Sequence, residues 1–184
     1  GVLEYMKSDD AADVLQQLDE EHQQEVLDAL DPEDRVEIEK VLEYPEDSAG
    51  GIMQTELVRV RAASSVRDAI EEIRRTAEDT GELHEVFVVD GEGHLVGWVK
   101  ERDLILAEDA TRIGAITTQV PVTVPVDMDQ EEIATFVQDY DLSSVPVVDA
   151  QNHLVGRILV DDILDVIQEE ADEDILRQGG SRAE

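Results

Sequence analysis

The chain contains no cysteine and few aromatic residues. The absence of cysteine among its 184 residues excludes disulfides and thiolate metal sites, and it is compatible with the reducing cytosol. Aromatic residues make up 3% and hydrophobic residues 41% of the chain, so a folded core has to be built from Val, Ile, Leu and Ala. The four histidines are too scattered along the sequence to suggest a zinc site.

Basic residues are scarce as well. Forty-seven acids face fourteen bases, which gives a formal net charge of −33. Such a chain should repel nucleic acids and anionic lipids and attract cations, so we expect no nucleic-acid partner. The bulk acidity also fits solubility or adaptation to a high-salt cytoplasm, and the preference for arginine over lysine favours that interpretation. Neither interpretation explains where individual acids lie.

Long hydrophobic runs are missing too. No stretch approaches the ~18 consecutive apolar residues that a membrane-spanning helix needs. Residues 1–4 lack the basic and apolar regions that begin a signal peptide. We therefore expect this fragment to be soluble.

The first 44 residues show short helical patterns. The cluster Ser8-Asp9-Asp10 is typical of a helix N-cap, and Asp31-Pro32 places proline at the first position of a later helix. Three short helices bury little surface by themselves, so we expect them to belong to a larger helical array whose beginning is absent. The composition changes at residues 44–51, which predicts a loop and a domain boundary.

An internal repeat occupies most of the remaining chain. Residues 90–97, Asp-Gly-Glu-Gly-His-Leu-Val-Gly, correspond to residues 149–156, Asp-Ala-Gln-Asn-His-Leu-Val-Gly. The first copy carries a short insertion around residues 77–81. Hydrophobic periodicity predicts strand, helix, strand, turn, strand and helix in each copy. The predicted elements are 58–60, 66–75, 86–89, 95–99 and 101–106 in the first copy, and 122–124, 129–140, 145–148, 154–160 and 161–167 in the second.

This β-α-β-β-α repeat, with its Val-Val-Asp, turn and Leu-Val-Gly, resembles the CBS domain. The resemblance implies an α+β fold, a tandem CBS-domain pair packed sheet to sheet over residues ~50–170 and preceded by a short all-α segment. The amino-acid sequences of several segments narrow the resemblance to MgtE-type magnesium channels and transporters. These segments are 44–53, 127–134, 139–142, 160–167 and 169–175. The implied domains are a partial acidic helical domain (1–44), two CBS domains (45–109 and 110–169) and the start of a connecting helix (170–184).

The resemblance implies a regulatory function. It suggests a cytosolic Mg²⁺-sensing region of a magnesium channel or transporter, in which Mg²⁺ bridges acidic surfaces and favours the closed state. It also implies a homodimer through the CBS domains, a transmembrane pore domain absent from this fragment, and a place at the cytoplasmic face of the cell membrane. The sequence shows no catalytic triad, no phosphate-binding loop before a helix and no acid–base pair, so we expect no enzyme.

Mg²⁺ binds oxygen ligands and keeps several waters, so one or two carboxylates for each ion suffice. Asp162 and Asp165 share one face of a predicted helix because they lie three residues apart. A solvated acidic face explains such a cluster equally well. The MgtE resemblance implies a metal-binding role for the acids at matched positions, which are Asp9, Asp13, Asp129, Glu131, Asp141, Asp162, Asp165, Glu170, Glu173 and Asp174.

The alternative function is that of a CBS regulatory module that senses adenosine nucleotides. Lys100, Arg102 and Asp103 lie where CBS pairs hold a nucleotide such as ATP, although the hydroxyl usual in that family is replaced by Lys100 in the first copy and by Leu159 in the second. The sequence favours Asp103 as an N-terminal residue of a helix. His94 recurs as His153 in the second copy, which favours a role in the turn over metal ligation.

Overall fold

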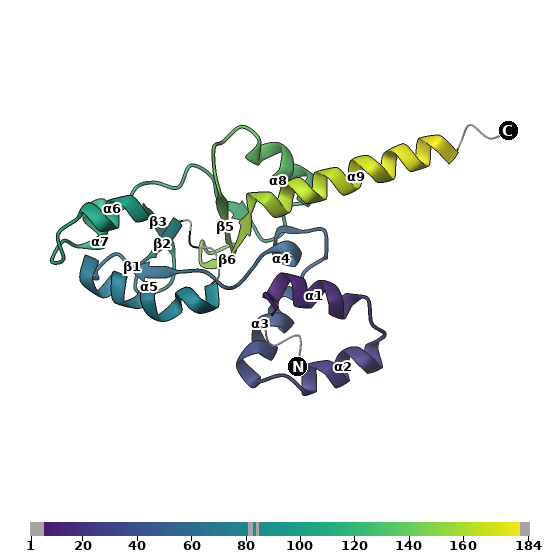
Figure 1. Cartoon of the computed structure of the whole chain (residues 1–184), viewed down its shortest axis with the longest axis horizontal. Helices are drawn as coiled ribbons and strands as arrows, with labels where there is room; N and C mark the ends of the chain where they lie inside the picture. The colour runs from purple at the N-terminus through teal and green to yellow at the C-terminus, as the bar shows by residue number, and fades with distance from the viewer. Residues whose placement is uncertain (1–5, 81–82, 84, 181–184) are drawn as a thin grey trace.

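Three short helices form a lobe of their own at the N-terminal end of the chain (Figure 1). In the computed structural model, which describes residues 6–80, 83 and 85–180, they are α1 (Ser8–Gln16), α2 (Glu20–Asp28) and α3 (Pro32–Leu42). Ala11, Leu15, Leu27 and Ile38 form their common core. The predicted start of α3 is confirmed, because Pro32 follows the N-cap residue Asp31.

The start of α1 differs from the prediction. Its N-cap residue is Lys7, and no side chain caps the helix. Ser8 lies inside the helix, where its backbone N–H and its hydroxyl donate to the carboxylate of Glu56 at 2.9 and 2.8 Å. The Ser8 hydroxyl also accepts the backbone N–H of Thr55 at 3.0 Å. A long-range contact therefore replaces the local cap, and it fastens α1 to the segment around residues 54–56.

Each repeat forms a three-stranded sheet. The first strand of each sheet runs parallel to the second, and the second runs antiparallel to the third. The central strands β2 and β5 are buried almost throughout, as their continuous apolar runs predict. The first strands begin later than predicted, and β4 has only two residues. The strands are β1 (Arg59–Arg61), β2 (Glu85–Val89), β3 (Leu95–Lys100), β4 (Val124–Pro125), β5 (Ser144–Val148) and β6 (Leu154–Leu159).

Most helices of the repeats differ in length from the prediction. In the first repeat, α5 (Val66–Thr80) continues into the predicted insertion, and α6 (Glu101–Leu106) has the predicted bounds. In the second repeat, α8 (Gln130–Val137) is shorter than predicted, whereas α9 (Val160–Gly180) is one continuous helix. The domain boundary drawn at 169/170 therefore lies within α9, whose C-terminal half projects away from the body of the molecule (Figure 1).

The segments that precede the two repeats are exchanged between them. The short helices α4 (Ala49–Ile52) and α7 (Ile113–Ile116) were not predicted. Ala49 packs into the core of the second repeat, and Ile113 packs into the core of the first. Residues 45–54, which the sequence order assigns to the first CBS domain, therefore lie in space against the second repeat.

The two sheets share an apolar interface, as expected for a CBS pair. Phe87, Val89 and Trp98 of the first repeat pack with Leu154 of the second, together with Leu57 and Val120 from the exchanged segments. The hydroxyl of Ser144 donates to Glu85 at 2.7 Å across this interface. None of the helices in the described residues combines the length and the apolar character needed to cross a bilayer.

Two glycines allow the exchanged segments to approach the sheets. Gln54 pairs with Arg157 beside Gly156, and Thr118 pairs with Trp98 beside Gly97. A Cβ at Gly97 would lie 2.3 Å from the carbonyl oxygen of Thr118, and a Cβ at Gly156 would lie 2.8 Å from that of Gln54. The glycine of each Leu-Val-Gly motif thus leaves room for a backbone that comes from the other repeat.

Gly97→Ala and Gly156→Ala are each expected to lower the free energy of unfolding by about 1–3 kcal/mol, because the added methyl group forces two backbones apart. Urea denaturation measures this change. Gly91→Ala is the matched control, since a Cβ there meets nothing within 4 Å, and its effect should stay within about 0.5 kcal/mol. Equal losses in all three variants would contradict the close-approach explanation.

Candidate functional site

The loop before α4 holds the helical lobe against the second repeat. The Ser48 hydroxyl donates to the Pro45 carbonyl at 2.6 Å and accepts the N–H of Gly51 at 3.3 Å, which closes a tight turn. The N–H of Ala49 donates to the carbonyl of Met128, and that of Gln130 donates to the carbonyl of Asp47, both at 2.8 Å. The loop is therefore bonded to the start of α8.

A cleft of about 670 Å³ opens between α1, this loop, the start of α8 and α9. We call it the acidic cleft, because carboxylates contribute much of its lining. In Figure 1, α1 lies on one side of α4 and α9 on the other. The cleft is lined by Asp13, Gln16, Gln17, Glu46, Asp47, Ile52, Gln130, Val166 and Glu169.

Asp9 lies buried beside the acidic cleft, with 9% of its surface exposed. The side-chain amide of Gln54 donates to its Oδ2 at 3.2 Å, whereas its buried Oδ1 receives no hydrogen bond from the described residues. Burial raises the pKa of Asp9 from 3.8 to about 6, and the charges of Asp10 and Asp162 add to that rise. A carboxyl group in this position is stable either when it is protonated or when a cation compensates the desolvation of its charge.

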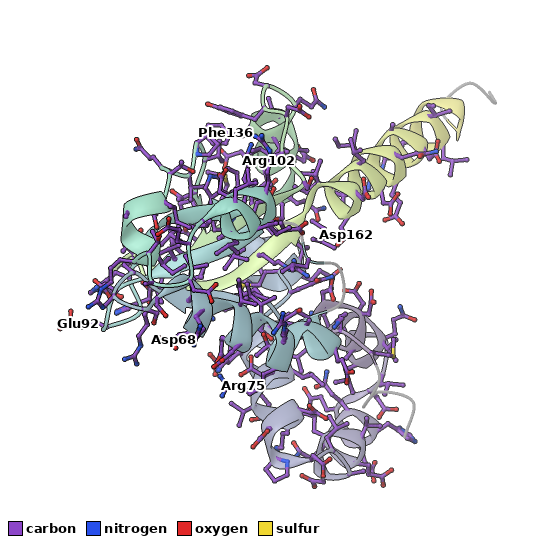
Figure 2. All side chains as sticks on the ribbon, turned by 60° about the vertical axis from the view of Figure 1, so that its left-hand side comes forward. Asp68, Arg75, Glu92, Arg102, Phe136 and Asp162 are labelled. Carbon is purple, nitrogen blue, oxygen red and sulfur yellow. The ribbon has the colours of Figure 1, made fainter. Side chains whose placement is uncertain are left out.

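Asp162 connects α9 to this group of acids. Partial burial raises its pKa, and the neighbouring charges of Asp10, Asp165 and Asp161 act in the same direction, whereas Arg157 opposes them. Figure 2 shows Asp162 at the start of α9, on the side that faces the helical lobe. Acids of α1 and α9 therefore repel one another although they lie far apart in the sequence.

Asp13 shows the same repulsion further along the cleft. Partial burial raises the pKa of Asp13 most, and the charges of Asp10, Glu46 and Glu169 raise it further. Three segments of the chain, α1, the loop before α4 and α9, thus contribute carboxylates that disfavour one another's ionised form. Oxygen ligands of this kind suit a hard cation such as Mg²⁺.

Arg157 is a buried cation close to these acids. It is 2% exposed, and its Nη2 donates to the carbonyl of Thr80 at 2.9 Å. Its backbone pairs with that of Gln54 through hydrogen bonds of 2.8 and 2.9 Å. Its charge lowers the pKa of Asp162 and offsets part of the acidic repulsion.

The structure brings together some of the predicted ligands. The charges of Asp9 and Asp162 interact directly, those of Asp13 and Asp162 each interact with Asp10, and Asp165 lies one helical turn from Asp162. Asp129 caps α8 by accepting the N–H of Glu131 at 2.8 Å. Both are exposed and flank Gln130, which lines the acidic cleft.

Other predicted ligands are not placed in the cleft. Asp141 is exposed in the segment between α8 and β5 and does not line the acidic cleft. Glu170, Glu173 and Asp174 belong to the backbone of α9, but their side chains lie outside the described part of the structure. Their role as ligands stays a prediction.

Sequence reasoning missed three acids, Asp10, Glu46 and Glu169. Glu169 lies four residues after Asp165 on the same helix, so helical spacing would have found it. Asp10 was assigned to a helix cap, and Glu46 to a loop motif. Only the docking of α1 shows that Asp10 lies near Asp162 and that Glu46 lies near Asp13.

The residues proposed for a nucleotide lie at the junction of β3 and α6. Lys100 is the N-cap residue of α6 but makes no side-chain cap hydrogen bond. Asp103 lies in the first turn of α6, which confirms it as an N-terminal helix residue. Lys100 and Arg102 are exposed. The described clefts are lined by other residues.

Comparison with known proteins identifies the family. The profile of the MgtE intracellular N domain matches residues 1–47, and the CBS-domain profile matches residues 49–109 and 113–169. A solved structure of the cytosolic domain of the Mg²⁺ channel MgtE in complex with ATP is 42% identical, with a TM-score of 0.85, and the match covers 90% of this chain and 68% of that chain. The chain belongs to the MgtE family.

Further MgtE relatives agree with this assignment. The soluble part of a magnesium transporter is 41% identical with a TM-score of 0.86, and the match covers 92% of this chain and 66% of that one. The magnesium transporter MgtE of Thermus thermophilus is 42% identical over 93% of this chain and 39% of its own length. The chain therefore spans about two fifths of that curated relative.

The MgtE assignment confirms the predicted fold, an α+β chain with a helical segment before a tandem CBS pair. The MgtE relatives are named as a channel and as transporters rather than as enzymes. The chain thus matches the part of MgtE that was solved as its cytosolic domain.

Asp9→Asn is expected to raise the free energy of unfolding at neutral pH without divalent cations by about 1–3 kcal/mol, because it removes a desolvated charge. The folded-state pKa of Asp9, about 6, exceeds the ordinary value of 3.8. Protonated Asp9 therefore stabilises the fold fully below pH 3.8, and this stability is lost as the pH rises through about 6. Denaturation series over this range should show a smaller loss in Asp9→Asn than in the unmodified chain.

The matched control is Asp19→Asn. Asp19 is the exposed N-cap of α2, and hydrogen bonds from the backbone and side chain of His22 lower its pKa. Because the pKa of Asp19 is lowered from 3.8, its effect on stability falls mainly at lower pH, and Asp19→Asn should leave the loss of stability between the two pKa values of Asp9 nearly unchanged. An unaltered pH dependence in Asp9→Asn would show that Asp9 does not carry it.

Proposed function

We propose that this chain senses Mg²⁺ as the regulatory region of a magnesium channel or transporter. The observation that supports the proposal most is the convergence of carboxylates from α1, the loop before α4 and α9 on the acidic cleft. Burial and mutual repulsion raise the pKa of Asp9, Asp13 and Asp162. An uncompensated arrangement of this kind favours separation of the helical lobe from α9.

The residues of the cleft fit a hydrated Mg²⁺ ion. Mg²⁺ retains several waters and takes one or two carboxylates, and the cleft of about 670 Å³ has room for such an ion with its waters. The buried Oδ1 of Asp9 receives no hydrogen bond from the described residues. When bound, Mg²⁺ would neutralise the repulsion between the segments. Asp13, Glu46 and Glu169 of the cleft lining would hold it, or Asp162 and Asp165 at the start of α9, whose charges interact with Asp9 and Asp10 of α1.

The energies are large enough to decide between two states. Two like charges ~4 Å apart in partly buried surroundings repel by about 4 kcal/mol, and the repulsion falls in proportion to distance. Repulsion of this order would compete with the hydrogen bonds that hold the helical lobe, such as those of Ser8 to Glu56, each contributing about 1–3 kcal/mol. Neutralising the carboxylates would therefore shift the balance towards the compact state. A bound cation shifts the equilibrium between the open and compact states by the difference between its affinities for the two states.

The helix α9 provides a route from the cleft to a distant part of the protein. Asp162, Asp165 and Glu169 lie on its first half, and the helix continues without interruption to Gly180. Its 21 residues span about 30 Å at 1.5 Å for each residue, and Figure 1 shows it leaving the body of the molecule. We place the pore domain of the intact protein beyond this helix, with the regulatory region at the cytoplasmic face of the membrane.

A CBS homodimer would hold the two CBS domains in place while the helical lobe moves relative to α9. Large apolar side chains are exposed on α6, α8 and α9, including Ile105 at 78% and Leu106 at 68%. In Figure 2, Phe136 of α8 and Arg102 of α6 both lie along the upper side. An exposed apolar face of this kind supports an interface between two copies.

The second candidate function is nucleotide sensing. One MgtE relative at 42% identity was solved in complex with ATP. Lys100 and Arg102 are exposed cations at the β3–α6 junction, where they are free to approach phosphates, and Asp103 is beside them. ATP binding at this junction is compatible with Mg²⁺ sensing at the acidic cleft.

Asp162→Asn combined with Asp165→Asn should raise the Mg²⁺ concentration needed for compaction about tenfold or more, because two carboxylates on α9 lose their charge. Small-angle X-ray scattering and limited proteolysis during a Mg²⁺ titration measure the change. Monovalent salt is held constant and high, so that general screening is already complete. Glu101→Gln with Glu108→Gln, which removes the same charge from exposed positions around α6, should leave the titration unchanged.

The same titration separates the alternatives. A response of the unmodified chain to ATP but not to Mg²⁺ would favour the nucleotide-sensing function, and Lys100→Ala with Arg102→Ala should then abolish it. A chain that responds specifically to neither ligand would be a salt-adapted scaffold. An identical Mg²⁺ response in both double variants would remove Asp162 and Asp165 from the proposed ligands.

Ile105→Ser with Leu106→Ser is expected to shift the chain from dimer to monomer in sedimentation velocity, because it replaces two exposed apolar side chains of α6. Val36→Ser is the control, since Val36 is 49% exposed but lies in the helical lobe. A dimer that persists in the double variant at the same concentration would place the interface elsewhere.

A further inference from the structure

The turns after β2 and β5 bring two histidines into contact. His94 and His153 occupy the same position in the two repeats, and their rings stack with centroids 4.5 Å apart and planes at 16°. Backbone bonds join the turns, because the N–H of Leu95 donates to Asn152 at 3.0 Å and the N–H of Leu154 donates to Gly93 at 3.1 Å. The pair thus lies at the junction of the two sheets, where sequence spacing gave no hint of a histidine cluster.

Each histidine is paired with an aspartate of its own turn. The Oδ1 of Asp90 accepts the backbone N–H groups of Glu92 and His94 at 2.9 and 3.0 Å, and its Oδ2 lies 2.9 Å from the Nδ1 of His94. Asp149 makes the corresponding contacts with His153 in the second repeat. Both histidines therefore take part in their turns, as the repeat predicts.

The first turn has one additional ligand group. Glu92 lies where the second turn has Gln151, and its Oε2 is 3.6 Å from the Nδ1 of His94. Ligand atoms of Asp90, Glu92 and His94 all lie within 4.8 Å of one another. The turn itself does not need Glu92, because the second turn closes in the same way with glutamine, and the Glu92 side chain is 82% exposed.

The separations match those around a small metal ion. Nitrogen and oxygen ligands lie ~2.0–2.2 Å from Zn²⁺, so neighbouring ligands in its shell are ~3–3.5 Å apart. The observed separations of 2.9 and 3.6 Å require only a small rotation of the exposed Glu92 side chain towards the half-buried Asp90 and His94. The backbone N–H and the ring of His94 hold the Asp90 carboxylate in place at 3.0 and 2.9 Å.

We propose that Asp90, Glu92 and His94 bind one divalent transition-metal cation of the Zn²⁺ or Ni²⁺ type. An imidazole ligand selects such ions over Mg²⁺, which prefers oxygen. Neutral His94 keeps its single ring proton, which moves from Nδ1 to Nε2, and the ion takes the place of that proton between Nδ1 and Asp90. Water completes the coordination shell on the exposed side.

This metal site is separate from the acidic cleft. Figure 2 shows Glu92 at one end of the molecule and Asp162 on the other side, at the start of α9. The site does not depend on the proposed Mg²⁺ function. Because a metal ion held by this turn binds the folded chain, its binding should also stabilise the folded chain by mass action.

The test is isothermal titration of the full chain with Zn²⁺ in a buffer that contains millimolar Mg²⁺ to occupy the acidic cleft. One equivalent of Zn²⁺ should bind, and the NMR signals of His94 and His153 should shift together. Glu92→Gln, which copies the second turn, should weaken binding by about tenfold or more. Gln151→Glu, which copies the first turn into the second, should add a second equivalent.

The two substitutions change exposed positions, so both variants should fold normally. Equal Zn²⁺ affinity in the unmodified chain and in Glu92→Gln would overturn the proposal. It would also fail if Zn²⁺ binding were lost in Asp162→Asn with Asp165→Asn while the signal of His94 stayed unchanged, because the ion would then occupy the acidic cleft. Absence of any binding in the presence of Mg²⁺ would exclude the site outright.

Discussion

Repulsion between carboxylates on α1 and α9 is the constraint on which the arrangement of this chain depends. Asp9 is buried with one oxygen that receives no hydrogen bond from the described residues, and Asp162 feels the charges of Asp10 and Asp165. A buried or crowded carboxylate stays ionised only with a compensating partner. The packing of the helical lobe is therefore coupled to whatever neutralises these acids, a proton or a cation. The same coupling makes the region suitable as a sensor.

The exchanged segments determine which acids meet. Residues 45–54 leave the helical lobe, cross to the second repeat and bond to its segment 126–130 before the first sheet begins. This path places α1 beside α9 rather than beside the helices of the first repeat. Gly156 permits this crossing because a Cβ there would lie 2.8 Å from the carbonyl oxygen of Gln54. Fold and candidate site thus depend on the same close backbone contacts.

The internal repeat offers a comparison within one molecule. Both turns between the antiparallel strands share the aspartate–histidine pair and the stacked rings. Gly93 in one copy and Asn152 in the other adopt positive φ angles of 89° and 65°, a conformation that glycine and asparagine tolerate. Features common to both copies are explained by the fold. Features present in one copy, such as Glu92 or the long α9, need a separate explanation.

The sequence by itself determined the repeat, the order of strands and helices and the buried central strands, because these follow from local periodicity, and it indicated the family through the resemblance of several segments. It identified Asp9 and Asp13 only through a family resemblance, whereas helical spacing also pointed to Asp162, and it assigned Ser8 and Asp10 to a helix cap. The tertiary structure decided that Ser8 bonds to Glu56, that Asp10 faces Asp162 and that His94 stacks on His153. These contacts join segments remote in the chain, and their energies depend on burial and distance, which no local pattern records.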